Sequence, residues 1–107
     1  MVAVTAAGCF PYFSKLAALD MYGLNDPHLA RHRPEDFGYG YMGHELMSPE
    51  YVVSRAPEIV VFHIGRNPSI PTAFVRTDFL NQYQLVSIEV PGWEGRPGYV
   101  WLRSGFP

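Results

Sequence analysis

The segment Ser48-Pro49-Glu50-Tyr51-Val52-Val53-Ser54-Arg55-Ala56-Pro57-Glu58-Ile59-Val60-Val61-Phe62-His63 contains a helix start, a helix stop and a strand. Ser48 is suited to cap a helix, and Pro49 is suited to its first position, where no backbone N–H is needed. Pro57 prevents the helix from continuing. The run from 58 to 63 predicts a strand, because β-branched and aromatic residues follow one another without a break. A helix leading directly into a strand is typical of a βαβ unit.

In the residues before this segment, predicted strands and a predicted helix also follow one another. The apolar run 2–7 predicts a first strand, and 16–22 predicts a second. Asp26 followed by Pro27 predicts a helix over 27–32. The glycine- and aromatic-rich stretch 33–47 predicts an ordered surface loop. Strands separated by helices favour parallel pairing.

The residues after it follow a different pattern. The stretch 83–90 alternates apolar and polar residues, and 99–103 returns after the Pro/Gly-rich stretch 91–98, which predicts a loose β-hairpin. One helical turn is expected around 74–80. We therefore expect one α/β domain over residues 1–107, with a small mainly parallel sheet, short flanking helices and a C-terminal antiparallel β-hairpin.

Composition excludes several classes of function. The 107 residues are 48% hydrophobic, enough to bury a core, and carry a formal net charge of −2. That charge removes the electrostatic attraction on which binding to a phosphate backbone depends, so nucleic acid is not an expected partner. The apolar runs are far shorter than the ~20 residues of a membrane-spanning helix, so the chain as given is expected to be soluble. A lone cysteine, Cys9, excludes an intrachain disulfide.

Polar residues follow the predicted parallel strands at the ends where ligands bind in open α/β sheets. Asp20 ends the second strand, and Asp26 and Arg31 lie in the next turn and helix. A structural interpretation stays open beside the ligand-binding one. Asp26 is equally suited to cap the helix, and Asp20 could form an ion pair with Arg31.

Histidines supply the other candidates. In the loop, His44 stands beside Glu45, where an imidazole and a carboxylate could act as acid and base, bind a sugar hydroxyl, or merely order the loop backbone. His28 and His32 share one helix face, but the spacing lacks the Glu of a zinc-binding HExxH motif. We therefore predict no metal and no other cofactor.

Four aromatic residues could offer flat apolar faces with polar rims, as carbohydrate sites often do, or could simply belong to the core. They are Tyr39, Tyr41, Trp93 and Tyr99.

A combination of short motifs resembles a known family. The motifs are Asp20-Met21-Tyr22-Gly23-Leu24-Asn25-Asp26-Pro27-His28-Leu29-Ala30-Arg31, Gly43-His44-Glu45, Ser48-Pro49-Glu50-Tyr51 and Arg55-Ala56-Pro57. Over residues 3–63 the chain resembles the soluble C-terminal extracytoplasmic domain of bacterial GT-C-type glycosyltransferases. The resemblance is to the arabinofuranosyltransferase-like members in particular, which use polyprenyl-phosphate sugars.

The resemblance implies an accessory domain of a membrane glycosyltransferase of cell-envelope glycan assembly, on the extracytoplasmic (periplasmic) face of the membrane. Its partners would be the membrane-embedded half of the same protein and the acceptor glycan. The catalytic carboxylate of that family lies in the membrane portion, so no catalytic residue is predicted in this chain. The chain would be a fragment of such a protein or a freestanding relative. The expected ligand-binding residues are Asp20, Asp26, Arg31, His44 and Glu45.

Two other functions stay open. A small independent hydrolase would require Asp20, His44 and Glu45 to converge around a pocket with perturbed pKa values. A structural interaction module would be marked by an exposed apolar patch larger than a few hundred Å².

Overall fold

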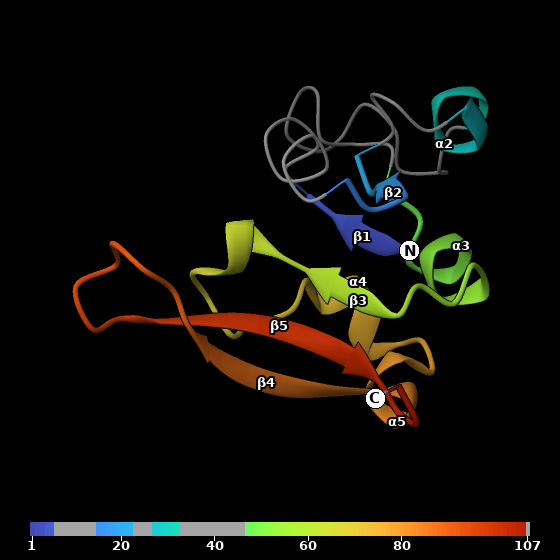
Figure 1. The fold of residues 1–107 in the computed structure, drawn as a ribbon. Coiled ribbons are helices and arrows are strands. Elements are labelled where there is room, and N and C mark those ends of the chain that lie inside the picture. Colours follow the sequence, from blue (N-terminus) through green and yellow to red (C-terminus); the bar gives the residue numbers. More distant parts are fainter. Residues whose placement is uncertain (6–14, 23–26, 33–46, 107) are drawn as a thin grey trace.

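The computed structural model describes residues 1–5, 15–22, 27–32 and 47–106 (Figure 1). Within them the chain forms a single sheet with short helices packed beside it. The strands are β1 (Val2–Val4), β2 (Ala18–Asp20), β3 (Ile59–Val61), β4 (Tyr83–Glu89) and β5 (Pro97–Arg103). The helices are α2 (Pro27–Arg31), α3 (Pro49–Ser54), α4 (Thr72–Val75) and α5 (Phe79–Gln82), with a 3₁₀ turn η1 (His63–Gly65).

The five strands are arranged in the order β2-β1-β3-β5-β4. Strand β1 pairs in parallel with both β2 and β3, with Ala3 opposite Leu19 on one side and Val60 on the other. Strand β5 is antiparallel to β3 and to β4. The sheet is therefore mixed, with two parallel and two antiparallel pairings.

The expectation of a mainly parallel sheet is wrong. The β4–β5 ladder aligns seven residues of each strand, whereas each parallel ladder aligns three. The short connection 90–96 can return the chain only in the antiparallel direction. Because β5 then inserts between β4 and β3, the hairpin is part of the main sheet and not an appendage to a parallel core.

The core lies on the face of the sheet that carries the helices. Each of α3, α4 and α5 contributes one buried side chain to it, namely Val52, Phe74 and Phe79. These pack on alternate strand residues, including Ala3, Leu19 and Val60. Phe62, Phe74 and Phe79 meet edge to face, with ring centroids 5.0 to 5.7 Å apart, a preferred aromatic arrangement. In Figure 1, α4 lies behind β3.

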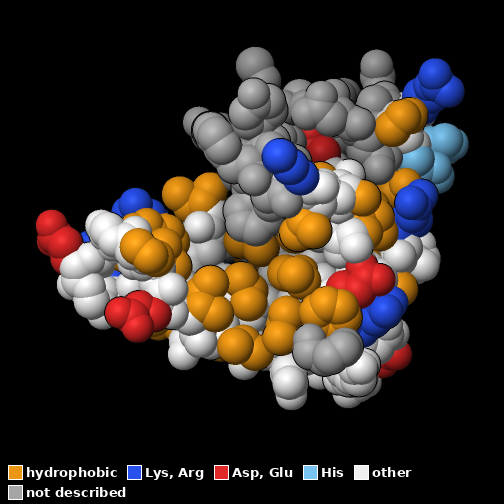
Figure 2. Space-filling view, viewed as in Figure 1, with side chains coloured by type: hydrophobic (Ala, Val, Ile, Leu, Met, Phe, Trp, Pro, Cys, Tyr) orange, Lys and Arg blue, Asp and Glu red, His pale blue; other side chains and the backbone are white. Residues whose placement is uncertain are grey.

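The opposite face is apolar over β1, β3 and β5. Val2, Val4 and Val61 form a second buried cluster there. Toward β4 the same face becomes half-exposed, as the register places Val100 opposite Val86 and Leu102 opposite Gln84. Figure 2 shows hydrophobic side chains gathered over this part of the sheet.

The helix start at Ser48 is confirmed. The Ser48 hydroxyl accepts a hydrogen bond from the backbone N–H of Tyr51 at 3.3 Å, and Pro49 opens the helix. Beyond β3, the single turn expected around 74–80 is instead two short helices, α4 and α5. Thr77 lies between them, where its hydroxyl donates to the Phe74 carbonyl and accepts from the Phe79 N–H, which satisfies one backbone group of each helix.

A polar cluster fastens the hairpin to the start of β3. Glu58 forms ion pairs with the Met1 α-amino group and with Arg103, whose Nη2 lies 3.6 Å from Glu58 Oε1. The hydrogen bond from the α-amino group is the main cause that lowers the Glu58 pKa, and Arg103 adds to it. The buried Tyr83 hydroxyl donates to the Pro57 carbonyl at 2.7 Å, and burial raises the Tyr83 pKa.

Over the described ranges, none of the helices is both long and apolar enough to cross a membrane.

Candidate functional site

Asp20 ends β2 and is a buried acidic residue, with 4% of its surface exposed. Its Oδ1 accepts a hydrogen bond from the backbone N–H of Tyr22 at 3.0 Å. A carboxylate that bonds the backbone two residues ahead forms an Asx turn, which ends the strand and offsets part of the cost of burial. This contact assigns Asp20 at least a structural role.

The predicted partner of Asp20 does not reach it. Arg31 lies exposed on α2, and no ion pair between the two side chains is formed. Asp26, His44 and Glu45 lie outside the described residues. The predicted ligand-binding set, and with it the hydrolase arrangement of Asp20, His44 and Glu45, therefore stays a prediction.

The two helical histidines stack instead of converging on an ion. The ring centroids of His28 and His32 are 4.1 Å apart, and His28 stacks in turn on Tyr51 of α3 at 4.1 Å. His32 Nδ1 lies 2.8 Å from the His28 carbonyl oxygen. In the described part of the chain, no group of three metal-ligating side chains comes together.

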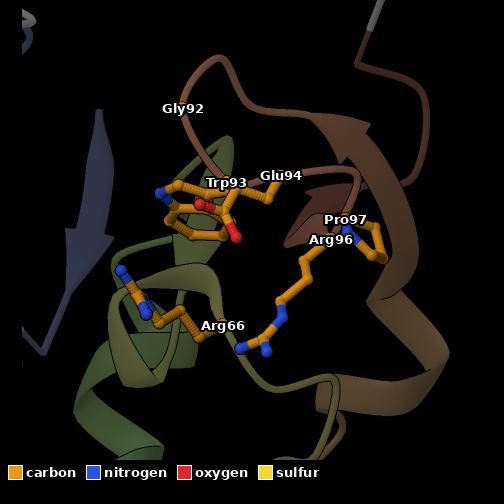
Figure 3. A pocket seen from close by; sticks show the side chains of 6 residues that line it. All are labelled: Arg66, Gly92, Trp93, Glu94, Arg96 and Pro97. Carbon is orange, nitrogen blue, oxygen red and sulfur yellow. The ribbon is translucent and has the colours of Figure 1, made fainter.

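A pocket of about 250 Å³ lies elsewhere, at the tip of the β4–β5 hairpin. Figure 3 shows Arg96 extending from the hairpin connection toward the segment that carries Arg66, with the Trp93 ring beside them. Arg66 directly follows η1 as its C-cap, so the pocket joins two segments that are distant in sequence. Its lining residues are Arg66, Gly92, Trp93, Glu94, Arg96 and Pro97.

The Trp93 ring is held from two directions. The Arg66 Cζ lies 4.8 Å from the ring centroid, within the range of a cation–π interaction. On the sheet side, the ring packs over Gly98, where a Cβ would lie 3.4 Å from Trp93 Cζ3. The Trp93 carbonyl also accepts the Arg96 N–H at 2.9 Å, so one tight turn sets both side chains.

Both segments that form the pocket contain left-handed backbone. His63 and Ile64 have φ values of 51° and 53°, and Glu94 has a φ of 51°. Residues without the freedom of glycine adopt this conformation at a cost of about 1–3 kcal/mol each. Gly65 follows at φ 78°, and an added Cβ would lie 3.3 Å from the Tyr99 carbonyl oxygen. Such conformations persist where the surrounding structure holds them, and they cluster at ligand sites.

The charges of the pocket are positive on balance. Two exposed guanidinium groups and one exposed carboxylate, that of Glu94, line it. In the described part of the chain, neither arginine forms an ion pair. A cationic pocket on a chain with a formal net charge of −2 favours a negatively charged ligand.

Sequence reasoning missed most of this site. It singled out Trp93 among four aromatic residues but treated 91–98 only as a hairpin connection. Arg66 precedes Trp93 by a long stretch that includes both α4 and α5, and the meeting of the two depends on β5 pairing with β3. The density of Gly and Pro beside Trp93, Glu94 and Arg96 is the feature that could have indicated an ordered tip.

Fold and pocket together define a small α/β domain with a mixed sheet and a cationic pocket at one end. The chain belongs to the family described as "Domain of unknown function (DUF8728)", whose model matches residues 1–102. Neither a curated protein nor a solved structure matches the chain.

Proposed function

We propose that this chain is a non-catalytic binding domain whose hairpin-tip pocket takes an anionic ligand, with an acidic glycan as the class that fits best. The observation that carries the proposal is the pair of arginines beside Trp93. Arg66 and Arg96 come from separate segments, line one pocket and lack an ion-pair partner among the described residues.

The chemistry of guanidinium groups specifies the anion. Each is a planar group whose N–H donors match a carboxylate, sulfate or phosphate in bidentate fashion. Glu94, the one carboxylate among the lining residues, repels a densely charged ligand, so the two arginines and Glu94 together favour a ligand with a single negative charge. A carboxylate, as on a uronic acid, meets that condition better than a doubly charged phosphate.

Trp93 adds a means to recognise the rest of the ligand. An indole offers a large apolar surface and one N–H donor, which suits a sugar ring with its apolar faces and hydroxyl rim. The pocket volume of about 250 Å³ lies below the ~300–1,000 Å³ of typical sites for drug-sized ligands. One sugar residue, at the end or side of a chain, is therefore the unit of recognition.

The lining residues favour binding over catalysis. Nucleophilic catalysis most often uses a Ser, Thr, Cys or Lys activated by a base, and glycoside hydrolysis commonly uses two carboxyl groups. The described lining offers a single carboxylate, on Glu94, and no such nucleophile.

In its narrower form, the proposal places the domain in a membrane glycosyltransferase of cell-envelope glycan assembly, on the extracytoplasmic side. The membrane-embedded half of the same protein would then be its partner, and the ligand would be the acceptor glycan. The motif resemblance over residues 3–63 supports this form. The pocket supports only the broader one, in which the residues that bind glycan are those of the hairpin tip.

Titration followed by NMR tests the proposal. The chain has two tryptophans, so the indole N–H signal of Trp93 reports on the pocket while that of Trp101 serves as an internal reference. We expect millimolar glucuronate to shift Trp93 and the amides of Gly92 and Arg96, whereas glucose, which differs by the carboxylate, leaves them in place. Inorganic phosphate is the third ligand. Because it carries negative charge without a sugar ring, it shows whether charge alone is enough to shift the same signals.

Variants then assign the contacts. Arg66→Gln and Arg96→Gln should each reduce the glucuronate shifts several-fold. Arg76→Gln should not, because Arg76 lies exposed at the end of α4, away from the pocket. Equal shifts with glucose and glucuronate, or no shifts with any of the three ligands, would overturn the proposal.

A further inference from the structure

Strand β4 is an edge of the sheet, and no other strand of the described residues pairs with its outer side. The backbone N–H of Arg103 donates to the Glu58 carbonyl in the direction of β3, so the Tyr83/Arg103 pair is not hydrogen-bonded across the hairpin. Hydrogen-bonded pairs alternate along an antiparallel ladder, and Pro97, opposite Glu89, has no N–H to give. The backbone groups that point away from β5 are therefore those of Tyr83, Leu85, Ser87 and Glu89.

These outward groups are almost all unpaired. Phe79 accepts the Tyr83 N–H. Among the described residues, no hydrogen bond engages the outward N–H or C=O of Leu85, Ser87 or Glu89. A row of free donors and acceptors is a template for another strand.

The usual protection of an edge is missing from β4. Natural sheets guard their edges with charged side chains, prolines, bulges or very short strands. Strand β4 is seven residues long, regular against β5, and has no proline and no charged residue before Glu89. Leu85 and Ile88 are each 41% exposed. The other edge strand, β2, has three residues and ends in Asp20.

The apolar face of the sheet beside β4 also favours the pairing of β4 with another strand. The register places Val86 beside Val100 on the face opposite the helices, and Ile88 beside Gly98. Figure 2 shows that hydrophobic side chains cover this side of the hairpin. A strand added at β4 would extend both the ladder and this apolar face.

We infer that β4 pairs with β4 of a second copy of this chain, antiparallel, about a two-fold axis at Val86. That register aligns all seven residues of each strand and sets Leu85 opposite Ser87 of the other copy. Both residues carry outward backbone groups, so each such pair exchanges two hydrogen bonds. Val86 meets its own copy on the apolar face.

Charge is compatible with self-pairing in this register. Glu89, the one charged residue of β4, lies opposite Tyr83 of the other copy, so the two Glu89 carboxylates sit at opposite ends of the ladder. A two-fold contact of this kind is isologous and closes after two copies, which yields a continuous ten-stranded sheet and not a fibre.

Cysteine cross-linking tests the register directly. In a Cys9→Ser background, Val86→Cys places two thiols on the axis, in a non-hydrogen-bonded pair with Cα atoms about 4.5 Å apart, where a disulfide forms. Gln84→Cys is the matched control, because Gln84 lies opposite Ile88 of the other copy. We expect mild oxidation to link the Val86→Cys chains several-fold faster than the Gln84→Cys chains.

Sedimentation of the unmodified chain over a range of concentrations provides the second readout. We expect a monomer–dimer equilibrium that Ser87→Pro shifts to monomer, since proline removes an outward N–H and leaves the β5 ladder intact. Ser87→Ala should dimerise like the original chain, and the melting temperatures of both variants report on folding. The inference is overturned by a monomer at all concentrations, by equal cross-linking at positions 84 and 86, or by protection of the β4 amides only when a different protein is added.

Discussion

The guanidinium of Arg66 lies over the ring of Trp93, with its Cζ 4.8 Å from the ring centroid. A contact of this kind at an exposed site contributes about 0.5–1 kcal/mol. Its larger effect is positional, because it joins the strained turn after β3 to the tip of the β4–β5 hairpin. The pocket exists only where these two segments meet.

The first prediction concerns Gly98→Ala. The added Cβ would lie 2.7 Å from Val90 Cγ2 and 3.2 Å from Ile88 Cγ1, so these two side chains must shift beside the Trp93 ring, whose Cζ3 the Cβ would contact at 3.4 Å. We expect the free energy of unfolding to fall by about 1–3 kcal/mol, as for other overpacked sites. We also expect the glucuronate-induced shift of the Trp93 indole N–H to decrease. Urea unfolding and the same NMR titration measure the two effects.

Ser87→Ala is the control for that variant, as it changes an exposed residue on the facing strand. Its unfolding free energy and its ligand-induced shifts should match those of the original chain. A Gly98→Ala protein with unchanged stability and an unchanged Trp93 signal would contradict the assigned packing.

The second prediction concerns Asp20 and Arg31, the two residues that the sequence suggested as an ion pair. Asp20→Ala should destabilise the fold by about 1–3 kcal/mol, because it leaves the Tyr22 N–H without the acceptor at 3.0 Å. Asp20→Asn should cost less, since the amide oxygen can still accept. Arg31→Ala should change stability by no more than about 0.5 kcal/mol, as expected for an exposed side chain. Thermal unfolding of the three variants measures these changes in stability. Equal losses of stability for Asp20→Ala and Arg31→Ala would support the ion-pair interpretation.

Local sequence chemistry predicted the elements better than their assembly. Ser48 and Pro49 mark the start of α3 because capping involves only neighbouring residues. The strand segments around Val60, Leu19 and Val86 were found from apolar runs and alternation. The mixed sheet was missed because no local pattern shows that β5 returns beside β3. The pocket was missed for the same reason, since Arg66 and Trp93 meet only through that pairing.

The third prediction concerns the Tyr83 hydroxyl. Tyr83→Phe leaves the Pro57 carbonyl without its donor at 2.7 Å and should lower the free energy of unfolding by about 1–2 kcal/mol. Tyr99→Phe is the control, because the Tyr99 hydroxyl donates to none of the described residues. Denaturant unfolding at neutral pH compares the two. A Tyr83→Phe protein as stable as Tyr99→Phe would show that the hydrogen bond makes no net contribution.

Alkaline pH probes the same group in the original chain. Burial raises the Tyr83 pKa above its ordinary value of 10.0, so the folded state holds the phenol in its neutral form. The corresponding stability is fully present below pH 10.0 and is lost as the pH rises through the raised folded pKa. Tyr83→Phe should not lose this component, and its unfolding curve should therefore respond less to pH in that range.

The last prediction concerns the stability that Glu58 contributes at acid pH. The Met1 α-amino group and Arg103 hold the Glu58 pKa below its ordinary value of 4.5, so the ionised carboxylate favours the folded state. Its contribution is present above pH 4.5 and is lost as the pH falls through the lowered folded pKa. Glu58→Gln should therefore melt at a lower temperature than the original chain at pH 7, and the difference should shrink steadily in acid. Glu89→Gln, at an exposed position without an ion pair among the described residues, should melt like the original chain at pH 7. Melting temperatures from pH 7 down to acid measure both variants, and a constant gap for Glu58→Gln at every pH would show that its carboxylate does not stabilise the junction of β3 with the hairpin.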